Sequence, residues 1–158
     1  MTENRTMIRC DKLTKRFGST LAVDQVSFEM HAGEILGFLG PNGAGKSTTM
    51  KILTSFLAPT SGSAQVAGFD VTDDSLKARA RIGYLPEDTS LYREMRVIEY
   101  LDYVTELRGI PRADRRGRIK KIGETTGILD VLGKRIGTLS KGYRQRVGLT
   151  QAMVHDPD

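Results

Sequence analysis

The chain has 158 residues, enough for one compact domain with a hydrophobic core. Apolar residues make up 39% and charged residues 27%, which is typical of globular proteins. Trp is absent and aromatic residues total 6%, so a base-stacking platform for nucleic acid is disfavoured. The single cysteine, Cys10, excludes an internal disulfide and agrees with a reducing cytoplasm. No apolar run is long enough to span a membrane, and residues 1–7 lack a signal-peptide pattern.

The net charge of +5 is unevenly distributed along the chain. Residues 108–146 carry 12 Lys or Arg and 3 Asp or Glu, a net charge of +9, and the remaining residues have a net charge of −4. Such a patch can meet nucleic acid, anionic lipid, nucleotide or an acidic partner, or it can be a solvated helix face. For the cluster at residues 112–121 we favour the solvated helix face, with contact to a membrane partner subunit as the main functional alternative.

The first half of the chain predicts mainly strands. Residues 7–17 and 21–30 alternate partly between apolar and polar and are joined by a turn. Residues 35–39, Ile-Leu-Gly-Phe-Leu, form a near-continuous apolar run, which is typical of a strand buried on both faces of a parallel sheet. A glycine-rich loop follows at 40–45, and apolar residues then recur at helical spacing up to Pro59.

The rest of the chain predicts short elements and then a helical block. In chain order we expect a turn at 60–62, a strand at 63–69, a short helix at 73–80, a short strand at 82–85, an amphipathic helix at 97–107, a basic helix at 112–126, a turn at 139–142 and a final helix at 143–154. The coarse prediction is therefore a mixed sheet in the first half and helices in the second.

Residues 40–47, Gly-Pro-Asn-Gly-Ala-Gly-Lys-Ser, match the phosphate-loop pattern G-x-x-x-x-G-K-[ST] between a predicted strand and a predicted helix. Gly40, Gly43 and Gly45 allow positive φ angles and let the backbone approach a phosphate closely. Successive N–H groups then form an anion nest, to which the helix N-terminus adds partial positive charge. These residues predict a nucleotide-binding loop.

The side chains that follow the loop complete this prediction. Lys46 can reach the β- and γ-phosphates, the Ser47 hydroxyl can bind Mg²⁺, and Thr48 and Thr49 offer further donors. The alternative is a glycine-rich turn that merely caps a helix, but a chance match in a chain of this length is on the order of one in a hundred or less. The loop alone does not separate GTPases, kinases, helicases and transport ATPases.

Four motifs in chain order resemble the ATPase subunit of ATP-binding cassette (ABC) transporters. They are an A-loop at 13–18, the phosphate loop at 40–48, a Q-loop segment at 82–87 and a signature motif at 139–146. The resemblance covers the whole chain and implies an α/β fold, a P-loop NTPase with a RecA-like core. It also implies an antiparallel β subdomain with the phosphate-loop part of the core at about residues 6–90, and a helical subdomain with the signature at about 91–155.

The resemblance also implies roles for individual residues. Phe17 would stack on adenine, Ser47 and Glu87 would lie at the Mg²⁺, and Ser140 and Gly142 would face the γ-phosphate held by a second cassette. The phosphates would be cradled by Asn42, Gly43, Ala44, Gly45, Lys46, Ser47 and Thr48. Simpler readings exist for three of these residues: Phe17 as a core residue at a strand end, Glu87 as an ordinary turn acid, and Ser140 as an N-cap, a role compatible with nucleotide contact.

Details of two motifs favour the ABC-2 exporter branch, whose members export drugs, antibiotics, polysaccharides or ions. Glu87 in the Q-loop and Ser-Lys-Gly at 140–142 in the signature resemble that branch. The commonest signature is Leu-Ser-Gly-Gly-Gln, so Lys141 replaces a Gly and Tyr143 replaces the Gln. The lysine adds positive charge near a triphosphate, whereas loss of the Gln removes one polar contact at the composite site.

The resemblance further implies an apolar strand ending in Asp-Glu, a D-loop and a switch histidine, and none of these occurs in the 158 residues. His31 and His155 do not match the switch position. We therefore expect a domain truncated at its C-terminus before its catalytic carboxylates, with no catalytic residue beyond the phosphate loop. We expect weak or no ATP binding and no useful turnover. We also expect exposed apolar side chains and unpaired backbone groups at 35–39, and hence poor solubility or partial order.

The expected cofactors are ATP and Mg²⁺, and the expected partners are a second ABC ATPase subunit, docked head to tail, and a separate membrane permease. The expected location is the cytoplasm, at the inner face of the cell membrane, and no direct nucleic-acid contact is expected. Two alternatives stay open: a non-transport ABC protein that acts on nucleic acid or the ribosome, and a non-hydrolysing ATP-binding fragment.

Overall fold

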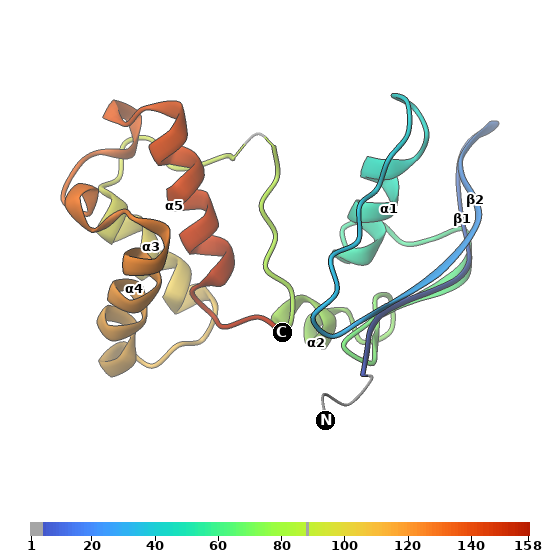
Figure 1. Ribbon diagram of the computed structural model, residues 1–158, viewed down its shortest axis with the longest axis horizontal. Helices are drawn as coiled ribbons and strands as arrows, with labels where there is room; N and C mark the ends of the chain where they lie inside the picture. Colours follow the sequence, from blue (N-terminus) through green and yellow to red (C-terminus); the bar gives the residue numbers. More distant parts are fainter. Residues whose placement is uncertain (1–4, 88) are drawn as a thin grey trace. The chain divides into compact units, whose positions relative to one another are not determined.

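The computed structural model describes residues 5–87 and 89–158, which form two compact units. The first unit extends to Ile82 and includes Asp158, and the second runs from Gly83 to Pro157 (Figure 1). Among the described residues, none of the helices combines the length and the apolar character that a bilayer crossing requires.

The described part of the first unit contains an antiparallel sheet with the strand order β2-β1-β3-β4. β1 spans Thr6–Phe17 and β2 spans Thr20–His31, so both predicted strands are confirmed to within one residue at each end. Their two-residue turn places Gly18 at φ +56°, a conformation that glycine adopts at low cost. The predicted mixed sheet is wrong, since every pairing in this sheet is antiparallel.

The predicted single strand at 63–69 is instead a hairpin of β3, Ser61–Val66, and β4, Phe69–Asp70. Between them Ala67 has φ +51° and Gly68 has φ +82°, the two positive angles of a type I′ turn. Alanine seldom adopts this conformation, so Ala-Gly gives a weaker turn signal than Asn-Gly. The turn expected at 60–62 is also wrong, because its last two residues belong to β3 and Ser61 already pairs with Thr14 of β1.

Helix α1, Lys46–Leu53, packs two of its apolar side chains against the sheet and leaves Met50 exposed. Its Ile52 and Leu53 join a buried cluster that also contains Cys10, Leu13, Ala64, Val66 and Val71. The prediction of a helix up to Pro59 was too long. Ser55 turns to φ +57° after the last helical residue, and the side chain of Phe56 is 74% exposed. The short helix α2, Ser75–Ala80, starts two residues later than predicted and buries only Ala78.

Two predicted strands are absent from the described structure. Residues 35–39 and residues 82–85 lie in irregular backbone. Ile35 is 100% exposed and Leu39 is 95% exposed, so the expected exposure of apolar side chains in this segment is confirmed. Phe38 alone packs inward, edge-on to Phe28 with 5.3 Å between the ring centroids. A strand buried on both faces needs a neighbouring strand on each side, and the described sheet includes neither segment.

The second unit is helical, as predicted. α3 spans Val97–Leu107, α4 spans Arg112–Thr126 and α5 spans Lys141–Met153, with 3₁₀ turns at Leu129–Val131 and Ile136–Thr138. The bounds of α3 and α4 are those predicted, whereas α5 begins two residues before the predicted start and includes half of the expected turn at 139–142. The core contains Val97, Tyr100, Leu101, Val104, Ile119, Ile128, Val131, Ile136, Leu139, Val147 and Val154.

Polar contacts also hold the three helices together. The hydroxyls of Thr126 in α4 and Thr150 in α5 lie 2.7 Å apart in the buried interior. The Tyr100 hydroxyl of α3 donates to the Gln151 side chain of α5 at 2.5 Å. Burial is the main cause that raises the pKa of Tyr100 to about 12. α5 is therefore fixed by both neighbouring helices.

Candidate nucleotide site

The glycine loop has the backbone that its sequence predicts. Gly40 has φ +146°, Gly43 has φ +87° and Gly45 has φ +83°, so the expectation of positive φ at all three glycines is confirmed. These angles turn the chain tightly ahead of α1. A side chain at any of them would meet the steric penalty of the left-handed region.

The loop and the first turn of α1 present several free donors. Within the described structure, the backbone N–H groups of Gly43, Gly45, Lys46, Ser47 and Thr48 donate to no protein acceptor. The N–H groups of a helix's first turn have no intrahelical partner, and together with loop amides they form a concave site for an anion. This arrangement is an anion nest at the positive end of a helix dipole.

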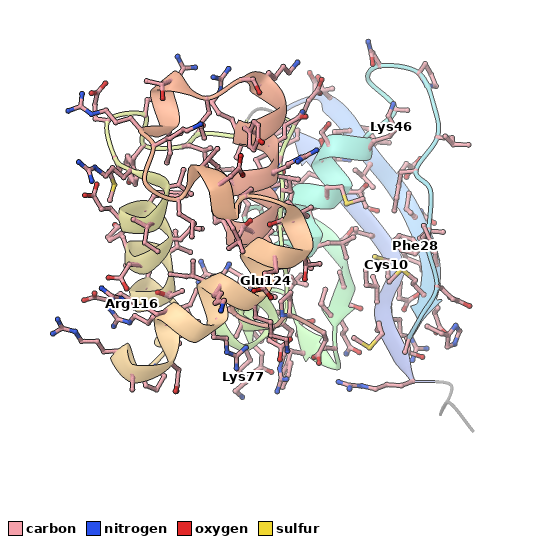
Figure 2. The ribbon with its side chains drawn as sticks, turned by 60° about the vertical axis from the view of Figure 1, so that its left-hand side comes forward. Cys10, Phe28, Lys46, Lys77, Arg116 and Glu124 are labelled. Carbon is pink, nitrogen blue, oxygen red and sulfur yellow. The ribbon has the colours of Figure 1, made fainter. Side chains whose placement is uncertain are left out.

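Lys46 brings a full positive charge to the same loop. Its ammonium donates to the carbonyl oxygen of Gly40 at 2.5 Å and to that of Pro41 at 2.7 Å. The side chain therefore folds back along the loop that precedes α1, and Lys46 is labelled in Figure 2. A cation held beside free amides is the combination that binds phosphate oxygens.

The start of α1 is seated on the sheet through Gly45. A methyl group at this position would lie 2.3 Å from the carbonyl oxygen of Ala22 and 3.2 Å from a methyl of Val23, both in β2. Only glycine permits so close an approach of the helix to the strand. The anion nest is therefore attached to the sheet by a contact that any side chain would break.

The hydroxyl groups after the lysine have different environments. Ser47 is exposed in the first turn of α1, where its oxygen is available to a metal ion, and Thr48 is half-buried. Thr49 is only 3% exposed, and its hydroxyl donates to the Gly45 carbonyl at 3.0 Å. The expectation that Thr49 offers a further donor to phosphate is therefore wrong, because that donor is used inside the helix.

Phe17 ends β1 with its ring 47% exposed, so the reading of this residue as a core side chain is wrong. The ammonium of Lys15 lies 5.3 Å from the ring centroid, and it donates to the Ala58 carbonyl at 2.7 Å. An exposed ring at a strand end can stack on a planar base.

The signature segment begins α5. Ser140 is the N-cap, and its hydroxyl oxygen accepts a hydrogen bond from the Tyr143 N–H at 3.3 Å. Lys141 and Gly142 occupy the first turn and are exposed. The Arg144 guanidinium donates to the Leu139 carbonyl and so fixes the chain just before the cap. The segment presents a second helix N-terminus with an exposed lysine beside it.

Tyr143 occupies the position where the resemblance expects Gln, and its side chain contacts other residues of the second unit. Its hydroxyl donates to the Asp130 carboxylate at 2.9 Å, and the Arg146 guanidinium lies 5.5 Å from the ring centroid. The hydrogen bond to Asp130 is the main cause that raises the pKa of Tyr143. No sequence pattern predicts this pair, because the two residues are 13 positions apart and belong to different elements.

Glu87 is exposed and lies in irregular backbone within the second unit. It lines a hollow of about 480 Å³ together with Arg93, Lys141, Arg144 and other residues of the same unit. The same segment packs closely on α5, since a methyl group at Gly148 would lie 2.8 Å from the Leu85 side chain. The Q-loop segment and the signature helix are thus in direct contact.

Ser47 belongs to the first unit and Glu87 to the second, so their shared metal contact stays a prediction. In the described part of the chain, no group of three or more His, Cys, Asp or Glu could hold a metal ion. His31 ends β2, and its N–H donates to the Glu34 carboxylate at 2.7 Å, which lowers the pKa of Glu34. His155 follows α5.

The comparisons with known proteins agree with the motifs. The family profile described as ABC transporter matches residues 23–158. The probable multidrug ABC transporter ATP-binding protein YbhF of Escherichia coli (strain K12) is 38% identical over 157 residues, which cover 99% of this chain and 27% of YbhF. The xylose/arabinose import ATP-binding protein XacJ of Haloferax volcanii is 38% identical over 152 residues, which cover 96% of this chain and 39% of XacJ.

Solved structures show the same fold. An ATP binding subunit of an ABC transporter superposes with a TM-score of 0.85 at 26% identity, covering 96% of this chain and 63% of that subunit. The chain therefore has the P-loop NTPase fold of ABC ATPase subunits, and it spans well under two thirds of the curated relatives YbhF and XacJ. On this evidence the chain belongs to the ABC transporter family.

Proposed function

We propose that this chain is the ATP-binding part of an ABC transporter and that the nest of loop residues 40–48 holds the phosphates of ATP, weakly when residues 1–158 are alone. The observation that carries the proposal is the set of free N–H groups at Gly43, Gly45 and the first turn of α1, beside the Lys46 ammonium. Family membership supports ATP rather than another phosphate compound. Asn42 and Ala44 complete the loop around the phosphates.

The remaining site residues act around this nest. Phe17 would stack on the adenine with its exposed ring. The exposed Ser47 hydroxyl and the Glu87 carboxylate would hold Mg²⁺, since oxygen atoms are the ligands that this ion prefers. Bound Mg²⁺ neutralises charge on the β- and γ-phosphates.

We further propose a second copy of the cassette as partner. Ser140 and Gly142 begin α5 with free space around them, and Lys141 projects a cation from the same turn. This helix N-terminus would face the γ-phosphate bound by the partner copy, head to tail, and Lys141 would add attraction to the triphosphate. A membrane permease would be the other partner, and the cassette would then lie at the cytoplasmic face of the membrane.

The direction of transport is proposed from two motif positions. Glu87 in the Q-loop and Lys141 in the signature follow the pattern of ABC-2 exporters, and the multidrug name of YbhF agrees with it. XacJ, an import protein, is equally similar in overall identity, so identity alone does not set the direction. The motif positions, rather than overall similarity, carry the exporter proposal.

Hydrolysis depends on an oriented water as well as on phosphate binding. Neither the phosphate loop nor the signature turn supplies a carboxylate for that water. We therefore propose that residues 1–158 by themselves do not turn ATP over at a useful rate, and we assign no catalytic base among them.

The test is binding of a fluorescent ATP analogue by the whole chain, with and without Mg²⁺. Lys46→Ala removes the cation at the loop, and we expect affinity to fall more than about tenfold, as loss of a charge-assisted contact predicts. Lys51→Ala is the matched control, because Lys51 is an exposed lysine of the same helix, outside the loop. Equal affinity for the Lys46→Ala variant and the original chain would refute the assignment.

A further inference from the structure

Helix α4 carries a concentration of positive charge, and none of its residues belongs to the proposed nucleotide site. Its 15 residues include six Lys or Arg and two Asp or Glu. Arg112, Arg116 and Lys120 follow one another at intervals of four residues, so they lie in a row along the helix. Lys121, turned by about 100° around the helix from Lys120, extends this row, and we call the four residues the α4 basic face. They belong to the helix marked by the Arg116 and Glu124 labels in Figure 2.

The other two cations of α4 are already paired. Arg115 is 14% exposed at its side chain and binds the Glu106 carboxylate at 2.7 Å. Arg118 lies 3.6 Å from Asp156. By contrast, all four residues of the α4 basic face are exposed, and no described carboxylate lies within ion-pair distance of them. These four charges are therefore uncompensated within the described structure.

The inner side of α4 fixes this orientation. Ile119 and Thr126 are buried, and Gly123 packs so closely on Leu129 that a methyl group there would lie 3.0 Å from its side chain. The hydroxyl contact between Thr126 and Thr150 ties the helix to α5. The cations thus project from a rigid support, and ordering them for a partner costs little backbone entropy.

The residue types of α4 indicate which class of partner the α4 basic face would bind. α4 has no aromatic residue, so it offers no ring on which a nucleic-acid base could stack. Its isoleucines face inward and are buried or half-buried, so the face would attract charge without inserting into hydrocarbon. Four exposed Lys or Arg along one helix match the surface of a bilayer that contains anionic lipids. We propose that the α4 basic face binds an anionic phospholipid surface.

This inference goes beyond the proposed function, because it needs neither nucleotide nor a permease. It predicts direct lipid contact by the cassette itself. Each Lys or Arg near such a surface strengthens binding roughly fivefold, and added salt weakens the attraction within a Debye length.

The experiment is co-sedimentation of the whole chain with vesicles of phosphatidylglycerol and phosphatidylcholine, without nucleotide. We expect binding at about 0.05 M salt, its loss at about 0.5 M salt, and no binding to pure phosphatidylcholine. The triple variant Arg116→Gln, Lys120→Gln and Lys121→Gln should bind more than about tenfold less tightly. Glutamine has a helix propensity close to that of Lys and Arg, so α4 should still form, as circular dichroism would verify.

Two controls test whether vesicle binding depends on the α4 basic face or only on the overall charge of the chain. A variant with Lys51→Gln, Lys134→Gln and Arg135→Gln loses the same charge at exposed positions outside α4, and it should bind vesicles as the original chain does. Lys46→Ala should also retain vesicle binding, so failure of the proposed nucleotide site and failure of this inference are distinguishable. Equal weakening by both triple variants would overturn the inference. It would also be overturned if the α4 variant lost affinity for an RNA duplex while vesicle binding stayed unchanged.

Discussion

The contact between Gly45 and β2 allows a quantitative test of how the phosphate loop is held. Gly45→Ala keeps the residue at φ +83°, which costs an L-amino acid about 1–2 kcal/mol. Its methyl group would also lie 2.3 Å from the Ala22 carbonyl oxygen, more than an ångström inside an ordinary contact. The close atom belongs to backbone in a paired strand, so it cannot rotate away. Overpacking of this kind costs about 1–3 kcal/mol, which gives a total loss of about 2–5 kcal/mol.

Gly43→Ala is the matched control. Gly43 has nearly the same angle, φ +87°, but a methyl group there would have nothing within 4 Å. This variant should therefore lose only the conformational part, about 1–2 kcal/mol. The difference between the two variants measures the contact of the loop with β2.

The assay is urea denaturation of both variants, followed by circular dichroism, with the free energy of unfolding extrapolated to water. Nucleotide binding would not distinguish the two variants, since a methyl group at either position would obstruct a phosphate bound as proposed. If both variants lost the same free energy of unfolding, the Ala22 contact would not hold the loop, and the structural reasoning would fail.

Three further predictions concern other sites. Gly117→Ala in α4, where a methyl group meets nothing within 4 Å, should raise the free energy of unfolding by about 0.5–1 kcal/mol, and an unchanged urea midpoint would contradict this. Burial raises the pKa of the Cys10 thiol to about 11 from 9.0. The neutral thiol therefore contributes its full share of the free energy of unfolding below pH 9.0, and this share is lost as the pH rises toward 11. Ellman's reagent at pH 8 should react with Cys10 only after unfolding. Ile35→Ser with Leu39→Ser should increase solubility in a precipitation assay and change stability by less than about 0.5 kcal/mol, because both side chains are exposed.

The sequence predicted best those elements whose signals are local. The bounds of α4 are correct because Pro111 precedes its first residue and Gly127, at φ +67°, follows its last. The positive φ angles of the phosphate-loop glycines follow from the motif itself. In each case the residues that carry the signal are those that adopt the conformation.

The errors concern features that depend on residues distant in sequence. Residues 35–39 have the composition of a buried strand, but composition does not supply the neighbouring strand that such a segment needs. The hydrogen bond between Tyr143 and Asp130 joins two elements and leaves no pattern in either. Thr49 looks like a phosphate donor by position, yet the helix uses its hydroxyl for the Gly45 carbonyl.

The difference between local signals and long-range contacts explains why the phosphate loop forms although the strand predicted before it does not. The shape of the loop comes from its own glycines and from the free amides at the start of α1. Its position comes from the close approach of Gly45 to β2, a strand fixed by its turn and its pairing with β1. None of these interactions uses a ladder at residues 35–39. The geometry that would bind phosphate is therefore a property of the loop, α1 and β2 together, and the substitutions at Gly43 and Gly45 separate the loop's own conformation from its attachment to the sheet.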